Sequence, residues 1–454
     1  MPSKFSWILL FLTASCRAQT DPGLAAVLTR LDKLEQQNRE LREEVQALRQ
    51  QIATQTEPRP SGSGASTEER LAVQEQHTQD LAQTRVEASQ RLPISLTGML
   101  LFNSFWNGRF SGAQDNPTVA SLNPTPRTAG ATLRQTVLGL KFQSPTTVLG
   151  AEVNGSLYMD FYANPVSTFG VERAVSNNLS RLMRLRVATV ELDWGSTNLL
   201  VGQDKPILSP REPNSLAQVG VSPLTGAGNP WLWQPQARLE HRFTFNDTTD
   251  LRAQIGVFQT SEQSAAVPTE FAPTLESVRP GLEGRLAFRH GFADSGHIEI
   301  APGFHVSTTH VAATSVPSRM YSVDWSIAPN AKLDFSGMFF TGENTANLGT
   351  LRQGFTITGT RQVIPIHALG GWAQLSYAAT PRLTFNLYGG QHDDRDRDLR
   401  PNGISKNLAY AGNALYRIAP NVILGLEAMQ VRTNYVGAGR RLNNHYDLAL
   451  AYQF

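Results

Sequence analysis

The stretch AEVNGSLYMDF, residues 151–161, places an apolar residue at every second position. One face carries Ala151, Val153, Gly155, Leu157, Met159 and Phe161, and the other carries Glu152, Asn154, Ser156, Tyr158 and Asp160. A period of two puts these sets on opposite sides of a β-strand. A strand with one apolar and one charged face fits the wall of a transmembrane barrel, between lipid and water.

The last residues repeat this pattern. Tyr446, Leu448, Leu450, Tyr452 and Phe454 share the apolar face, while His445, Asp447 and Gln453 share the polar face. An aromatic final residue with apolar residues two and four positions before it resembles the C-terminal signal of outer-membrane proteins. We therefore interpret these five apolar residues as an assembly signal, read by the barrel-assembly machinery.

Similar runs recur through the chain and predict a closed, all-β barrel of about sixteen antiparallel strands over residues 94–454. The expected strands start near residues 94, 133, 148, 182, 198, 235, 251, 280, 296, 319, 331, 368, 382, 405, 422 and 442. Short connections alternate with long ones, expected at 107–130, 162–180, 205–233, 260–279, 307–318, 343–366, 392–404 and 433–441. In lipid the sheet must close, because open edges leave backbone groups unpaired.

Aromatic residues recur near the expected strand ends. Trp106, Trp194, Trp325, Trp372 and Tyr377 are examples. Tyrosine and tryptophan favour the membrane–water interface, so this placement predicts aromatic girdles, although any one of these residues could instead be a core aromatic.

The first eighteen residues predict a signal peptide, since Lys4 precedes a short apolar run and small residues follow. Cleavage after Ala18 is the first interpretation. The alternative is a lipoprotein-type signal ending at Cys16, the single cysteine, although the usual branched residue is missing before it. Without Lys4 and Arg17 the 40 basic residues become 38 and equal the 38 acidic ones, which argues against a nucleic-acid partner.

Residues 24–56 predict a coiled coil of about four heptads, expected in the periplasm. Position a holds Leu24, Leu31, Asn38, Val45 and Ile52, and position d holds Val27, Leu34, Leu41 and Leu48. The alternative is one amphipathic helix packed on a globular body. Branched residues at a with leucine at d favour two strands. Residues 57–93 then predict a Pro/Gly/Ser linker and a weak helix.

Four segments resemble the DcaP-like porins, which belong with the phosphate-selective porin O and P group. They are QTVLGLKFQSP (135–145), MRLRVATVELDWG (183–195), LLVGQD (199–204) and QPQARLEHRF (234–243). The resemblance covers about residues 24–454. It implies an N-terminal coil, a sixteen-stranded barrel that forms a homotrimer, and small anions such as phosphate or dicarboxylates as solutes.

Charged residues expected on the inner face are the functional candidates. The predicted pore-lining residues are Arg184, Arg186, Lys205, Arg211, Glu212, Arg238, Arg242 and Arg285. In similar trimeric porins the third long loop, here residues 205–233, folds inward and narrows the pore. Fixed cations beside such a constriction favour anions through the local potential. Acidic residues such as Asp160, Glu240 and Glu283 could instead neutralise the arginines.

These features predict an outer-membrane porin through which small hydrophilic solutes diffuse passively. We expect it to transport ions and to prefer anions. One alternative is a structural anchor with a stalk and a plugged barrel; a barrel enzyme is a further one. The sequence has no GxSxG elbow and no HExxH motif, and we expect neither catalysis, nor a cofactor, nor a metal. The run HDDRDRDL (392–399) predicts self-paired surface charge rather than a calcium site.

Overall fold

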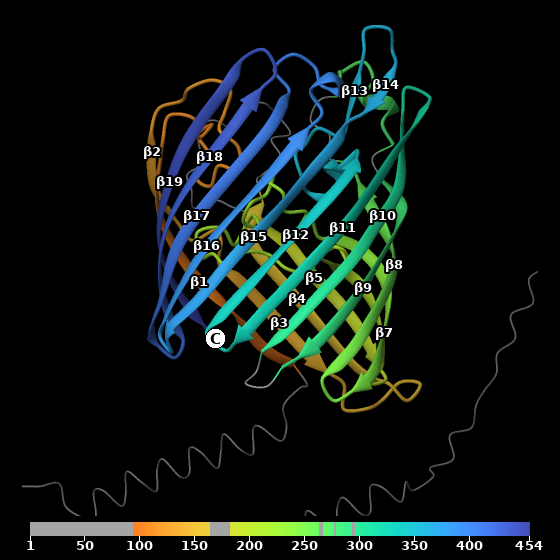
Figure 1. The fold of residues 1–454 in the computed structure, drawn as a ribbon, viewed down its shortest axis with the longest axis vertical. Helices are drawn as coiled ribbons and strands as arrows, with labels where there is room; N and C mark the ends of the chain where they lie inside the picture. Colours follow the sequence, from red (N-terminus) through yellow and green to blue (C-terminus); the bar gives the residue numbers. More distant parts are fainter. Residues whose placement is uncertain (1–93, 164–181, 263–266, 277, 293–295) are drawn as a thin grey trace, which may run out of the picture. The chain divides into compact units, whose positions relative to one another are not determined.

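The computed structural model describes residues 94–163, 182–262, 267–276, 278–292 and 296–454, which form a closed antiparallel β-barrel (Figure 1). Seventeen strands make up its sheet. Two of them, β2 and β3, lie one after the other against β1 and fill one place, so the barrel has sixteen strand positions. The predicted barrel is confirmed. The predicted signal peptide, coiled coil and linker lie outside the described residues.

The strands of the first half are β1 (Ile94–Asn107), β2 (Thr128–Thr132), β3 (Val137–Gln143), β4 (Glu152–Ala163), β5 (Leu182–Asp193), β6 (Thr197–Asp204), β7 (Gln234–Asn246), β8 (Thr249–Ser261) and β9 (Val278–Gly291). Those of the second half are β10 (His297–Val311), β11 (Thr314–Asn330), β12 (Leu333–Glu343), β15 (His367–Thr380), β16 (Leu383–Asp394), β17 (Ile404–Ala419), β18 (Val422–Tyr435) and β19 (Gly439–Gln453). A separate hairpin joins β13 (Phe355–Ile357) to β14 (Val363–Pro365).

The barrel closes where β1 pairs with β19, from Met99 opposite Gln453 to Asn107 opposite His445. Backbone hydrogen bonds between Gly98 and Phe454 extend this seam, at 2.9 and 3.1 Å. The C-terminus lies at one end of the barrel, and the β13–β14 hairpin rises from the opposite end (Figure 1). Both termini of the sheet therefore meet at one seam and leave no open edge.

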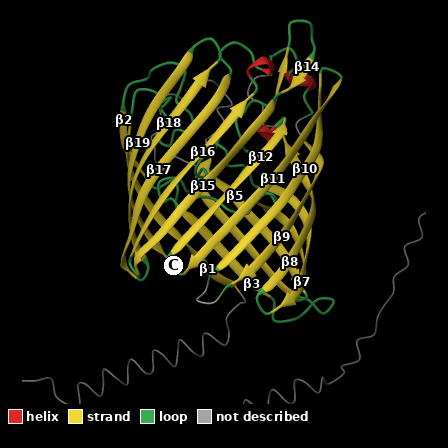
Figure 2. Ribbon diagram, in the orientation of Figure 1, coloured by secondary structure: helices red, strands yellow, loops and turns green. Residues whose placement is uncertain are grey.

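The connections at one end of the barrel are short, whereas most of those at the other end are long. The described residues contain three short helices, which lie towards the end that carries the long loops: η1 (Ala272–Thr274), η3 (Thr345–Leu348) and η4 (Asp396–Asp398) (Figure 2). In the part of the chain that the structure describes, no helix is long and apolar enough to cross a membrane.

Two of the predicted long loops are wrong. At 307–318, β10 continues to Val311 and β11 starts at Thr314, so only Ala312 and Ala313 connect them. Both alanines have positive φ angles, 50° and 59°, as the central residues of a tight type I′ turn require. At 433–441, β18 runs to Tyr435 and β19 starts at Gly439, which leaves three residues of connection.

The faces of the strands carry the expected side chains. On β19, Tyr446 and Tyr452 are exposed on the outside, whereas His445 and Asp447 are buried on the inside. The barrel is thus apolar outside and polar inside, the reverse of a soluble protein. Among the predicted girdle residues, the prediction for Trp372 is wrong, because this side chain faces inward and packs in an interior apolar cluster.

Candidate functional site

The connection between β6 and β7, residues 205–233 (the third loop), crosses the barrel interior. Prolines at 206, 210, 213, 223 and 230 keep it from pairing as a strand. Its residues Leu208, Leu224 and Ala227 pack in an apolar cluster with Met338 and Phe340 of β12. The interior is therefore partly filled by its own connecting segment.

Glycines allow the loop backbone to touch the barrel wall. Gly228 has a φ of 100°, and a Cβ there would lie 2.2 Å from the carbonyl oxygen of Gly371 on β15. A Cβ on Gly390 of β16 would lie 2.3 Å from the carbonyl oxygen of Ala227. Only residues without a side chain fit such a close approach of two backbones.

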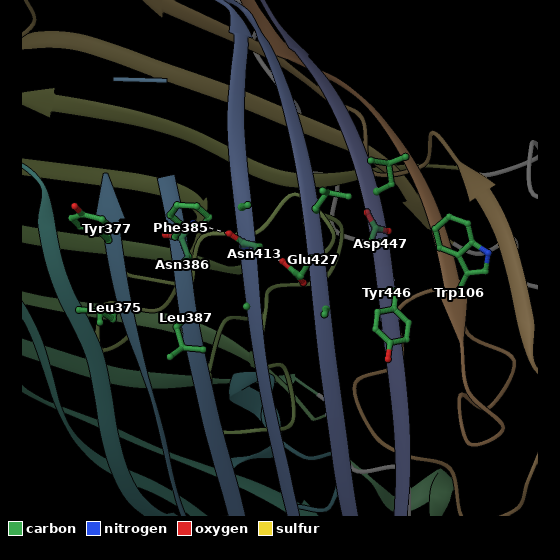
Figure 3. A pocket seen from close by; sticks show the side chains of 15 residues that line it. Trp106, Leu375, Tyr377, Phe385, Asn386, Leu387, Asn413, Glu427, Tyr446 and Asp447 are labelled. Atoms are coloured by element: carbon green, nitrogen blue, oxygen red, sulfur yellow. Dashed lines mark hydrogen bonds between the residues drawn. The ribbon is translucent and has the colours of Figure 1, made fainter. Parts of the chain in front are cut away.

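A row of polar side chains on the inner wall holds the middle of the third loop. This polar belt consists of Asn103, Gln135, Gln374, Ser376, Asn386, Asn413, Glu427 and Asp447, from β1, the β2–β3 break and β15 to β19. Four of these side chains are visible in Figure 3, where Asn386, Asn413, Glu427 and Asp447 follow one another across adjacent strands. Asn386 donates to Asn413 at 2.8 Å, and Asn413 donates to Glu427 at 3.0 Å.

Gln135 is the most connected member of the polar belt. Its side-chain amide donates to the carbonyl oxygen of Ala217, and its oxygen accepts from the N–H groups of Val219 and Gly220, all at 2.8 Å. It also donates to Asn103 at 3.0 Å. One buried amide thus satisfies three backbone groups of a loop that lies about eighty residues away in sequence.

Neighbouring loop residues are held in the same way. Asn103 donates to the carbonyl oxygen of Leu216 at 2.8 Å, and Asn413 donates to that of Asn214 at 2.7 Å. Ser215 donates its hydroxyl to Glu427 at 2.6 Å. Residues 214–220 of the loop therefore lie along the belt.

The same strands have a different character on the outer face. A groove of about 620 Å³ there is flanked by large side chains, including Trp106, Tyr377, Phe385, Leu387 and Tyr446 (Figure 3). Gly412, Ala414 and Ala428 line it as well. Because these residues are small, the groove is open between the aromatic rings.

Arginines and carboxylates occupy the facing part of the inner wall, from β4 to β11, which we call the arginine wall. Arg184 of β5 forms a bidentate pair with Asp160 of β4, at 3.1 and 2.6 Å, and it also donates to the carbonyl oxygen of Gly220. Arg186 approaches the same carboxylate at 3.6 Å. Two arginines therefore share one carboxylate, which leaves one net positive charge.

Aromatic rings separate the arginines of this region. Arg134 lies 3.9 Å from the centre of the Tyr162 ring, and Arg184 lies 5.2 Å from it. Arg184 and Arg186 lie 5.1 and 4.7 Å from the ring of Trp233. This arginine–aromatic stack places three like charges side by side, and each ring face attracts the cation next to it.

The remaining predicted pore-lining residues are mostly paired. Arg238 of β7 contacts Asp204 at 3.0 Å. Lys205 contacts Glu212 at 2.8 Å. Arg242 is exposed near the turn between β7 and β8 and has no ion pair among the described residues.

Two further predicted arginines meet in a buried network. Arg285 of β9 contacts Glu299 of β10 and Asp324 of β11, each at 2.7 Å, and is 3% exposed. Arg211 of the third loop contacts the same two carboxylates, with 2.6 Å to Glu299. Two cations balance two anions, so this network joins the loop to the wall without adding net charge.

Glu212 of the third loop is held as an anion. Burial opposes its ionisation, but the charge of Lys205 and hydrogen bonds from Lys205 and Ser222 hold the pKa of its carboxyl below its ordinary value. Lys205 and Glu212 thus cancel in charge, and neither contributes to the net potential of the loop.

His305 of β10 lies in a buried series of hydrogen bonds. Its ring nitrogens lie 2.9 Å from Glu283 and 2.9 Å from Ser307. The other oxygen of Glu283 accepts from the N–H of Ile207 in the third loop, at 2.8 Å. These hydrogen bonds therefore join the third loop to β9 and β10.

No group of three or more potential metal ligands occurs in the described ranges.

The sequence interpretation missed four residues of this interior. Gln135 and Arg134 lie in the break between β2 and β3, and Trp233 lies just before β7, so strand alternation does not assign them a face. Tyr162 has the same parity as Asp160 on β4, and this signal could have placed it inside.

Comparison with known proteins identifies the fold. No family model and no curated protein matches the sequence. The outer membrane channel DcaP of Acinetobacter baumannii is similar in structure, with 17% identity, 80% of this chain and 97% of that chain covered, and a TM-score of 0.65. An anion-selective porin from Comamonas acidovorans has 11% identity, coverage of 80% and 99%, and a TM-score of 0.50. OprB of Pseudomonas putida has 9% identity, coverage of 83% and 97%, and a TM-score of 0.51. The described part of the chain has the fold of the outer-membrane porins, and the predicted resemblance to DcaP is confirmed for that fold.

Proposed function

We propose that this protein is an outer-membrane porin through which small hydrophilic solutes diffuse passively, with a preference for anions. The observation that carries the preference is the sharing of Asp160 by Arg184 and Arg186 beside the third loop. Their side chains are 26% and 13% exposed, whereas Glu427 and Asp447 of the polar belt are 7% and 3% exposed. The net positive charge thus has better access to the lumen than the acidic pair.

Location in the outer membrane is part of this proposal. The apolar outer face and the closed sheet suit a bilayer, in which every backbone group needs a partner within the protein. We also propose that Tyr446, Leu448, Leu450, Tyr452 and Phe454 form the signal for the assembly machinery, with the stalk in the periplasm.

A homotrimer is the assembly we propose, from the resemblance to the DcaP-like porins. The outer groove lined by Trp106, Tyr377 and Tyr446 supports it, since a neighbouring subunit could fill the groove. Deletion of residues 24–56 should leave the oligomer intact under mild extraction but less resistant to heat. A stalkless protein that is monomeric under those conditions would instead favour assembly by the coil, for which the heptad residues favour a dimer.

A plugged barrel with a structural role is the second candidate, because the apolar cluster around Leu208 and Leu224 fills part of the interior. Single-channel recording of the refolded protein separates the two. A porin gives steady conductance steps with a larger permeability for chloride than for potassium. A bilayer that contains folded protein and shows no steps would favour the plug.

A further inference from the structure

A cavity of about 590 Å³ lies between the first loop (residues 108–127), the third loop and the β12–β15 connection (344–366). Asp115, Thr118, Arg134, Thr225 and Trp231 are among the residues that line it, together with Arg184 of the arginine–aromatic stack. Its size is in the range of sites for small molecules. The cavity thus lies directly beside the shared Arg184–Asp160 pair.

Among the buried donors at this cavity, two that have no hydrogen-bond partner in the described residues belong to Trp231 and Arg134. They are the indole N–H of Trp231, which is 8% exposed, and the Nε–H of Arg134, which is 9% exposed. A buried donor without a partner costs roughly 1–3 kcal/mol, so such groups are normally satisfied. Both would be satisfied by a molecule that carries hydrogen-bond acceptors, and the guanidinium favours a carboxylate over a neutral acceptor.

The same cavity also contains an anion. The Asp115 carboxylate, 14% exposed, contacts Arg134 at 3.0 Å. It would repel a second carboxylate of a bound solute but can accept hydrogen bonds from hydroxyl groups. The hydroxyl groups of Thr118 and Thr225 line the cavity as well. Arg184, which is paired with Asp160, and Arg352 line the cavity too, so the lining combines cationic donors for a carboxylate with partners for several hydroxyls.

We propose that this cavity is a binding site for a hydroxylated monocarboxylate of the size of a sugar acid. Its carboxylate meets Arg134 and Trp231, and its hydroxyls meet Asp115 and the two threonines. The ring of Tyr162, which also lines the cavity, contacts Arg134 and Arg184 and so holds their guanidinium groups beside the solute. This inference rests on the proposed function as an anion-preferring porin. It names the class of solute that binds in the pore beside the third loop.

The test is block of the chloride current by D-galacturonate, compared with succinate, in planar bilayers. We expect half-block by galacturonate at a concentration at least tenfold lower than by succinate. Trp231→Phe removes one donor and keeps a ring, so it should weaken the galacturonate block by about threefold to tenfold. Trp194→Phe, at an exposed position in the turn between β5 and β6, is the matched control and should leave the block unchanged.

Asp115→Asn tests the choice between the two solutes. Removal of its charge should strengthen block by succinate and narrow the difference from galacturonate, whereas Asp247→Asn in a short turn should not. Equal block by both solutes in the wild type, or an unchanged block in Trp231→Phe, would overturn the proposed site.

Calorimetric titration of galacturonate into the detergent-solubilised protein makes the result independent of conduction. Binding that Trp231→Phe weakens, in a protein without chloride steps, would support the site and contradict the porin proposal. Chloride steps without galacturonate binding would overturn the site and leave the porin proposal intact.

Discussion

The two halves of the inner wall hold the same loop by different chemistry. From β15 through β19 to the β2–β3 break, the polar belt uses mostly amides, which donate to or accept from the loop backbone. From β4 to β11, the arginine wall uses charged pairs such as Arg211 with Glu299. Amides fix position without a field, whereas unequal charge pairs create a potential. We infer that the polar belt positions the third loop and that the arginine wall sets the ion preference of the pore.

The largest effect on stability is expected where the arginine wall is most buried. Arg285→Met leaves Glu299 and Asp324 with Arg211 alone, so it should lower the free energy of unfolding by about 3–5 kcal/mol. Urea unfolding of the refolded barrel, followed by the loss of its heat-modifiable band, measures this change.

Arg289→Met is the matched control, because Arg289 lies on the same face of β9 and is exposed. It should change the free energy of unfolding by less than about 1 kcal/mol. Similar losses in both variants would mean that the buried network does not stabilise the barrel.

A smaller effect is expected in the polar belt. Gln135→Leu leaves the N–H groups of Val219 and Gly220 and the carbonyl of Ala217 without their partner, so it should cost about 1–3 kcal/mol in the free energy of unfolding. The third loop should also move more, which single-channel recording detects as a noisier current. Gln143→Leu, exposed on β3, is the control. A quiet Gln135→Leu channel would show that the belt does not position the loop.

Strand faces could be predicted from the sequence because alternation is a local property. It placed Arg184 and Arg186 inside and Tyr446 and Leu450 outside. The partners of the arginines could not be predicted, since Asp160 is one of several inward carboxylates and only the register of β4 and β5 selects it.

Turns without a chemical signal were missed for a related reason. A type I′ turn is usually marked by asparagine or glycine, but here it is made by Ala312 and Ala313. Trp372 was assigned to a girdle from its place near an expected strand end, without regard to which face of the strand it occupies. The role of Gln135 depends on tertiary contacts with residues 217–220, which no local pattern reports.

A change at the seam should affect neither half of the inner wall. Phe454→Ser removes a ring that packs over Gly98, and it weakens the proposed assembly signal. We expect less heat-modifiable barrel in the outer membrane, while the protein that does fold keeps the ion preference of the wild type. Wild-type yield would argue against the C-terminal signal, and an altered preference would show that the seam and the arginine wall are coupled.

The most direct test of the proposed anion preference is the reversal potential in a salt gradient for a graded series of variants. Arg184, Arg186 and Asp160 together carry one net positive charge, Arg186→Gln leaves none, and the double Gln variant leaves one negative charge. Screening reaches about 8 Å at physiological ionic strength, so the differences should grow at low salt. We predict an anion-preferring wild type, a weaker preference in Arg186→Gln, and a shift towards cations in the double variant. A cation-preferring wild type, or one reversal potential for all three proteins, would contradict the account.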